Sequence, residues 1–169
     1  METRGSEPED GSDSRGPTFL PPYINFRFQI MRVLGIDFGE RRIGLALSDP
    51  TGTLASPLPT VKRRAGKRPP LTTLIAIAES HGVKAVVLGL PLTLSGEESE
   101  WTRAVREVGA ALADRTGLPV HFVDERFTSV RAERAVRSLG LPKKKREQKE
   151  RVDAAAAILI LQSWLDRQS

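Results

Sequence analysis

The run of residues 84–90, KAVVLGL, is almost continuously apolar and is followed at once by a proline. A short apolar run of this kind predicts a strand that is buried on both faces, and the proline marks where the strand ends. A strand buried on both faces needs other elements packed above and below it. The rest of the sequence must therefore supply helices for two sides of a sheet.

Three further strands are predicted before this run. Residues 32–38 (RVLGIDF) and 42–48 (RIGLALS) are apolar segments joined by the short turn 39–41, which predicts an antiparallel hairpin. Residues 53–61 (TLASPLPTV) predict a third strand. Its two prolines favour a position at the edge of the sheet, because proline cannot donate a ladder hydrogen bond.

Helices and one more strand follow from the remaining pattern. Apolar residues at helical spacing predict helices over 71–78 and 101–117, and the apolar segment 119–123 (PVHFV) predicts a strand after the second of them. Further helices are expected over 129–139 and 152–165. This order of elements predicts an α/β fold with a mixed five-stranded sheet and helices on both faces.

One domain, residues 31–169, contains all of these elements. The chain has 169 residues, 39% of them hydrophobic, which suffices for one core. Residues 1–30 have the composition of a disordered tail, and they lack the basic start and apolar centre of a signal peptide. The longest apolar run, 154–161, is far shorter than the roughly 20 residues that span a bilayer. We therefore expect a cytoplasmic protein without membrane contact.

The charge of the chain is concentrated in two basic clusters. The formal net charge is +5, and there is no cysteine, which excludes disulfides and thiolate metal sites. Lysine and arginine clusters suit a phosphate backbone, although they also form solvated loops that keep a protein soluble. The candidates for contacting a nucleic acid are Lys62, Arg63, Arg64, Lys143, Lys144, Lys145, Arg146 and Lys149. The second group is expected to lie in a loop.

Three carboxylates lie where this layout would position catalytic groups. Asp37 lies at the end of the first strand, Glu125 at the end of the last strand, and Asp153 at the start of the last helix. A carboxylate beside a buried strand needs a cation or hydrogen-bond donors. Three of them without nearby His or Cys favour hard cations, Mg²⁺ or Mn²⁺, which can support phosphodiester hydrolysis.

Each carboxylate also has a structural explanation. Asp37 could organise the hairpin turn through its side chain, and Asp153 could cap the last helix. Glu125 could pair with Arg126 or Arg131. Asp124 competes with Glu125 as a ligand, because neighbouring residues in a strand point to opposite faces of the sheet.

Five motifs give the chain a family resemblance. They are GIDFG at 35–39, RIGLA at 42–46, GLPL at 89–92, DERFTS at 124–129 and VDAAA at 152–156. In this order they resemble the YqgF family of pre-16S ribosomal RNA nucleases, also called Holliday-junction-resolvase-like proteins. One departure is Leu94-Ser95-Gly96, where family members often carry an acidic residue before the glycine.

The resemblance implies a ribonuclease H-like fold and a metal-dependent endonuclease that matures the 5′ end of 16S ribosomal RNA. It also implies that Asp37, Glu125 and Asp153 are the catalytic and metal-binding residues, with Mg²⁺ or Mn²⁺ as cofactor. The implied partner is pre-16S RNA or branched DNA, and a homodimer is a further expectation. Two other functions stay open: a relative of the actin-like sugar kinases and ATPases, and a non-catalytic RNA-binding assembly factor.

Overall fold

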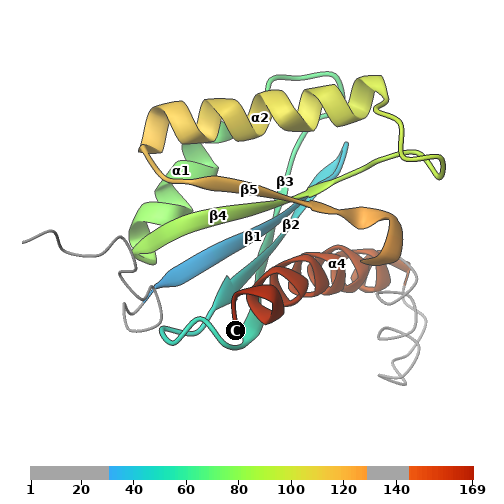
Figure 1. The fold of residues 1–169 in the computed structure, drawn as a ribbon. Coiled ribbons are helices and arrows are strands. Elements are labelled where there is room, and N and C mark those ends of the chain that lie inside the picture. Colours follow the sequence, from blue (N-terminus) through green and yellow to red (C-terminus); the bar gives the residue numbers. More distant parts are fainter. Residues whose placement is uncertain (1–30, 129–144) are drawn as a thin grey trace, which may run out of the picture.

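The computed structural model describes residues 31–128 and 145–169. The predicted tail, 1–30, and the whole of the predicted helix 129–139 lie outside these residues. Five strands and four helical segments make up the described part (Figure 1). The strands are β1 (Arg32–Phe38), β2 (Arg42–Ser48), β3 (Ala55–Lys62), β4 (Val83–Leu90) and β5 (Val120–Asp124). The helices are α1 (Leu71–Ser80), α2 (Glu100–Thr116), the short 3₁₀ helix η2 (Glu125–Phe127) and α4 (Lys145–Gln168).

The strands form one mixed sheet in the order β3-β2-β1-β4-β5. β2 runs antiparallel to both β1 and β3, whereas β1, β4 and β5 run parallel to one another. The predicted hairpin and the edge position of the proline-containing strand are therefore confirmed. Because β1, β4 and β5 are parallel, their carboxyl ends lie at the same edge of the sheet.

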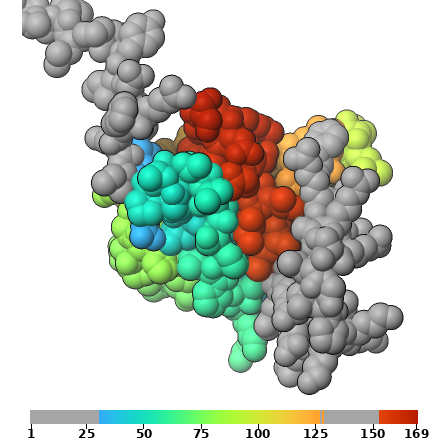
Figure 2. Space-filling view, turned by 90° about the horizontal axis from the view of Figure 1, so that it is seen from below, coloured from blue at the N-terminus to red at the C-terminus, as the bar shows by residue number. Residues whose placement is uncertain are grey.

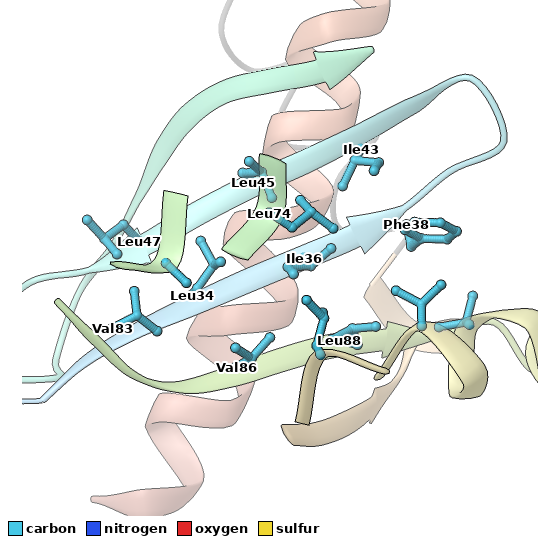
Figure 3. Close-up of a cluster of buried hydrophobic side chains, with 14 of the residues drawn as sticks. Leu34, Ile36, Phe38, Ile43, Leu45, Leu47, Leu74, Val83, Val86 and Leu88 are labelled. Atoms are coloured by element: carbon cyan, nitrogen blue, oxygen red, sulfur yellow. The ribbon is translucent and has the colours of Figure 1, made fainter. Parts of the chain in front are cut away.

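The two faces of the sheet carry separate cores, as the alternation of side chains along β1 shows. Leu34, Ile36 and Phe38 belong to the larger core, beneath α1 and α2 (Figure 3). Val33 belongs to the second core, which α4 covers. Alternation places Asp37 on the same face as Val33, toward α4. The prediction of helices on both faces is confirmed.

Close packing of α4 depends on a glycine in β1. A Cβ atom at Gly35 would lie 2.7 Å from Cβ of Leu161, a separation that side-chain carbons do not tolerate. The missing side chain therefore lets the helix approach the centre of the sheet. Seen from this face, α4 lies against residues of the β2–β3 region (Figure 2). Helix α4 thus packs directly against the strands.

Two predicted boundaries are wrong, and both affect candidate site residues. The last helix was expected over 152–165, after a basic loop, but α4 already begins at Lys145. Lys, Arg, Glu and Gln are strong helix formers, and their propensity outweighs the resemblance of a charged run to a solvated loop. The last strand ends at Asp124, and Glu125 begins η2 instead of closing the strand.

The ends of α2 follow clear local signals. Ser99 caps the helix, accepting a hydrogen bond from the backbone N–H of Thr102, whose hydroxyl accepts one from the N–H of Ser99. Gly117 ends the helix with a φ of 70°, a conformation that favours glycine. Within the described residues, no helix is both long and apolar enough to traverse a lipid bilayer.

Candidate active site

Three separate elements bring the predicted carboxylates to one edge of the sheet. Asp37 lies near the end of β1, Glu125 directly follows β5, and Asp153 lies well inside α4. The edge is the one at which the parallel strands end, on the right in Figure 1. A side-chain hydrogen bond joins Glu125 to Asp37, and Asp153 acts on Asp37 through its charge. Sequence positions more than 110 residues apart, 37 and 153, thus meet in one cluster.

Two glycines make room for this cluster. A Cβ at Gly89, near the end of β4, would lie 2.1 Å from Oε1 of Glu125. A Cβ at Gly44, which pairs with Asp37 across the hairpin, would lie 2.1 Å from the carbonyl oxygen of Asp153. Any larger residue at either position would push the carboxylate or its helix away. Sequence reasoning identified these glycines only as parts of motifs, because their role depends on contacts between distant elements.

In the absence of a cation, the electrostatics of the cluster raise the pKa of both Asp37 and Glu125. Burial, reinforced by the negative charge of Asp153, raises the pKa of Asp37 to about 6. Burial, followed by the charge of Asp37 and the hydrogen bond to it, raises the pKa of Glu125 to about 8. The hydrogen bond is explained by a protonated Glu125 donating to an ionised Asp37. These carboxylates are close together, partly buried and without enough compensating charge.

The neighbouring residue Asp124 has the opposite environment. Its carboxylate accepts hydrogen bonds from Nε of Arg126 at 2.8 and 3.0 Å and from the backbone N–H of that residue at 3.0 Å. The pKa of Asp124 is lowered, chiefly by the side-chain bond to Arg126. Arg126 therefore pairs with Asp124 and not with Glu125, and the side chain that meets Asp37 belongs to Glu125.

The structural explanations for Asp37 and Asp153 lose their basis in this geometry. The hairpin turn is closed by a backbone bond, from the N–H of Gly39 to the carbonyl of Arg42 at 3.0 Å. Asp153 cannot cap α4, because the helix begins at Lys145, more than two turns earlier. The third alternative, a pair between Glu125 and Arg131, falls on a residue outside the described part.

The donor set suits a hard divalent cation. All three groups are carboxylates, the ligands that Mg²⁺ and Mn²⁺ prefer, and their mutual repulsion would be relieved by positive charge. Across the described residues, no three acidic or histidine side chains are arranged so as to enclose an ion as they stand. The hydrogen bond from Glu125 to Asp37 occupies oxygen atoms that loss of the shared proton would release for coordination.

Comparison with known proteins agrees with this arrangement. A family model described as "RuvX: Holliday junction resolvase" matches residues 31–167. The chain belongs to the RuvX family. Relatives named "Putative pre-16S rRNA nuclease" include one from Koribacter versatilis, 48% identical over 80% of this chain and 87% of that protein. Another, from Maridesulfovibrio salexigens, is 44% identical over 81% of this chain and 99% of its own length.

A solved structure supports the fold. The chain resembles Thermus thermophilus RuvC with a TM-score of 0.50 and 19% identity, over 81% of this chain and 96% of that one. The predicted ribonuclease H-like fold and the resemblance to the YqgF family are confirmed. The RuvX match covers residues 31–167 and so includes Asp37, Glu125 and Asp153. The predicted division of the chain at residue 30 stays a prediction.

The first basic cluster of this RuvX family member divides into two kinds of residue. Lys62 and Arg64 are exposed, and Lys62 lies opposite Arg42 in the β2–β3 ladder, close to the carboxylate edge. Arg63 is partly buried: its guanidinium lies over the rings of Phe38, at 4.6 Å, and Trp101, at 5.5 Å. Its location resembles that of a structural residue more than that of a surface contact.

The second basic cluster is only partly described. Lys143 and Lys144 lie outside the described residues, whereas Lys145, Arg146 and Lys149 lie in the first turns of α4. The predicted loop is therefore wrong for these three positions. Their helix continues directly into Asp153, so the basic segment leads to the carboxylate edge. Its role as a nucleic-acid contact stays a prediction.

A larger hollow lies away from the carboxylates. It has a volume of about 660 Å³ and is lined largely by apolar and aromatic residues, among them Met31, Val33 and Trp164. Met31 precedes β1, so this hollow lies at the opposite end of the sheet from Asp37. No acidic residue lines it. Its chemistry does not suit phosphodiester hydrolysis, and size alone does not identify the active site.

Proposed function

We propose that this chain is a metal-dependent endonuclease that hydrolyses phosphodiester bonds in the 5′ region of pre-16S ribosomal RNA. The observation that carries the proposal is the convergence of Asp37, Glu125 and Asp153, with raised pKa values for the first two. The names of the relatives supply the substrate. The kinase alternative has no support from the family match, which covers residues 31–167 with a nuclease family.

The three carboxylates would hold Mg²⁺ or Mn²⁺. Such ions, when bound, supply an activated water and stabilise the leaving oxygen of the phosphodiester. The residues of the chain do the positioning. Asp37 and Asp153 bring two negative charges together. Glu125 would release its proton to solvent if a divalent cation were bound, because positive charge lowers the pKa of a neighbouring carboxyl. Gly44 and Gly89 keep the backbone and side-chain spacing that this requires.

The basic residues beside this edge would hold the nucleic-acid backbone. Lys62 and Arg64 are exposed on β3 and just after it, and the basic start of α4 approaches the same edge. Each lysine or arginine that meets a phosphate releases condensed counterions. We therefore expect RNA binding that weakens with salt, whereas cleavage itself depends on the carboxylates.

Branched DNA is the second candidate substrate. It is favoured by the printed description of the family, Holliday junction resolvase. The two substrates share a phosphodiester and the same metal-assisted chemistry, so the carboxylate cluster does not distinguish them. A third reading, an assembly factor that binds RNA without cutting it, predicts binding without products.

One experiment separates these functions. Purified protein is incubated with a precursor 16S RNA fragment and with a synthetic four-way DNA junction, each with EDTA, Mg²⁺ or Mn²⁺. The proposal predicts RNA products only with a divalent metal, and loss of those products in Glu125→Gln. Glu79→Gln is the control, because Glu79 is exposed near the end of α1. Junction cleavage without RNA cleavage would support the second candidate, and binding without products would overturn the enzymatic proposal.

Location and assembly follow from the same proposal. Processing of ribosomal RNA places the protein in the cytoplasm. A homodimer stays a prediction, which sedimentation of the purified chain with and without RNA would test. A single species with the mass of one chain under both conditions would contradict it.

A further inference from the structure

A small hollow adjoins the carboxylate cluster, between the β1–β2 turn and α4. Its volume is about 280 Å³, and it is lined by the β1–β2 turn, Gly39 to Arg42, and by Asp153 of α4. Asp153 belongs both to the hollow and to the cluster. A group bound in the hollow would therefore lie directly beside the atoms that the proposed metal ions would hold.

The turn that forms the wall is fixed by neighbouring elements. The backbone N–H of Arg63 donates to the carbonyl of Arg41 at 2.9 Å, and Nη1 of Arg63 donates to the carbonyl of Gly39 at 3.4 Å. Nη2 of the same residue donates to the carbonyl of Lys67 at 3.1 Å. The turn is also closed on itself by the bond from Gly39 to Arg42. The backbone on both sides of Arg41 is thus held in place.

Stacking completes this support. The guanidinium of Arg63 lies over the rings of Phe38 and Trp101, and the two rings stack with their centroids 5.7 Å apart. A planar guanidinium can stack and donate in its own plane at the same time, which a lysine ammonium cannot do. Arg63 therefore holds the wall of the hollow while its neighbours, Lys62 and Arg64, remain exposed.

The lining of the hollow combines two arginines with two acidic residues. Arg41 and Arg42 are adjacent, and the arginine guanidinium matches the geometry of a phosphate with paired N–H donors. Glu40 and Asp153 contribute negative charge to the same hollow. Cations bound at Asp153 would cancel part of that negative charge, so that the net charge of the hollow would become positive. The hollow is therefore best suited to an anion when the neighbouring cluster carries metal.

We propose that this hollow binds a backbone phosphate next to the phosphodiester that is cut, with Arg41 and Arg42 as its ligands. This inference rests on the proposed function, because it assumes that the bond that is cut lies at Asp37, Glu125 and Asp153. It adds a nucleic-acid contact that neither basic cluster contains. It also assigns Arg63 a positioning role in place of a substrate contact.

The first test measures binding without cleavage. A fluorescently labelled single-stranded RNA is titrated at several KCl concentrations with wild type, Arg41→Ala and Arg41→Gln. The buffer contains Ca²⁺, which binds carboxylate oxygens but replaces Mg²⁺ poorly in hydrolysis, and a gel checks that the RNA stays intact. Arg41 is exposed, so both variants should fold as wild type does. The expected result is weaker binding and a salt slope smaller by about 0.7, the value for one lost phosphate contact on a single strand. Arg115→Ala, at the end of α2, is the control and should match wild type.

The second test uses cleavage of the precursor RNA with Mg²⁺. A contact that is equally strong in the ground state and the transition state raises KM and leaves kcat unchanged. We expect Arg41→Ala to raise KM several-fold with kcat close to wild type, and Arg63→Lys to lower kcat because the wall and Asp153 shift. Arg115→Ala is again the control, since it removes an exposed positive charge at the end of α2, outside both basic clusters.

The outcomes separate this inference from the function on which it rests. If no protein cleaves RNA but Arg41→Ala still binds RNA more weakly and with the smaller salt slope, the phosphate site stands and the proposed function fails. If wild type cleaves and Arg41→Ala matches Arg115→Ala in slope and in KM, the phosphate site is overturned while the function stands. Binding is measured in Ca²⁺ with RNA that is shown to stay intact, so the first arm does not depend on any catalytic activity.

Discussion

Asp37 and Asp49 each lie at one end of the β1–β2 hairpin region, yet their environments are opposite. Asp49 follows β2, and its carboxylate accepts hydrogen bonds from the backbone N–H groups of Thr53, at 2.7 Å, and Leu54, at 3.0 Å, and from the hydroxyl of Thr51. The Thr51 hydroxyl, together with those backbone donors, lowers the pKa of Asp49 to about 2. The pKa of Asp37 is instead raised to about 6, chiefly by burial.

The contrast shows what a turn-organising aspartate looks like in this fold. Asp49 has donors for its oxygens and stays ionised with ease, and a local turn is the result. Asp37 is surrounded by other carboxylates, and backbone atoms close its turn. An amide at position 37 should therefore stabilise the metal-free fold more than the acid does. This difference is the basis for assigning Asp37 to chemistry.

The largest effect is expected from exchanging acid for amide at the two positions. Asp37→Asn should lower RNA cleavage by about three orders of magnitude or more, because it removes the charge that gathers divalent cations. Asp49→Asn should leave the rate within about twofold of wild type, since it affects a turn at the far end of β2. Single-turnover cleavage with saturating Mg²⁺ measures both. Equal losses in the two variants would remove the distinction between the residues.

The space around the cluster predicts the next effect. In Gly89→Ala, the new Cβ would meet Oε1 of Glu125 at 2.1 Å and displace the carboxylate. A misplacement of about 1 Å can cost about a hundredfold in rate, which is the loss expected here. Gly109→Ala is the matched control, because its Cβ would meet the ring of Phe122 at 2.6 Å, away from the carboxylates. A hundredfold loss in both variants would point to general destabilisation.

The two kinds of carboxylate should give opposite dependences of stability on pH. The pKa values of Asp37 and Glu125 are higher in the folded protein than in the unfolded chain. The free energy of unfolding of the metal-free protein should therefore fall as pH rises from about 4 to about 8. The pKa of Asp49 is lowered, so its contribution is present above pH 4 and is lost as pH falls toward 2.

Thermal melts in EDTA at pH 5 and pH 8.5 test the first part. Wild type should melt several degrees lower at the higher pH, and Glu125→Gln should reduce that difference. Added Mg²⁺ should reverse the loss at pH 8.5. An unchanged melting temperature between the two pH values in wild type would contradict the raised pKa of both carboxyls.

The smallest effect concerns the fold at Asp49. Asp49→Asn should lower the free energy of unfolding by about 1 kcal/mol, since its hydrogen bonds are exposed and an amide can replace some of them. Urea denaturation at pH 7 measures the change. Asp114→Asn is the control, because it makes the same exchange of acid for amide at an exposed residue of α2. A gain in stability in Asp49→Asn would contradict the turn-organising role of Asp49 and remove its contrast with Asp37.

The sequence was sufficient for the sheet and for singling out the three carboxylates, although Glu125 lies in η2 and Asp153 lies well inside α4. Strand periodicity and turn residues are local signals, and Asp37 follows from them together with the family motif. The boundary of α4 was missed, because a run of lysines fits a loop and a helix equally well until packing is known. The structural roles of Gly44 and Arg63 could not be predicted for a different reason. Their roles lie in contacts with Asp153 and with Phe38, which no local pattern encodes.

The most direct test of the metal centre is the effect of Mg²⁺ on the melting temperature of wild type and Asp37→Asn at pH 8.5, each against EDTA. If Asp37 is a metal ligand, Mg²⁺ should raise the melting temperature of wild type by several degrees and that of Asp37→Asn by much less. In EDTA, the variant should melt at or above the temperature of wild type. Equal stabilisation of both proteins by Mg²⁺, or a variant that melts well below wild type in EDTA, would contradict the assignment of Asp37 to a metal site.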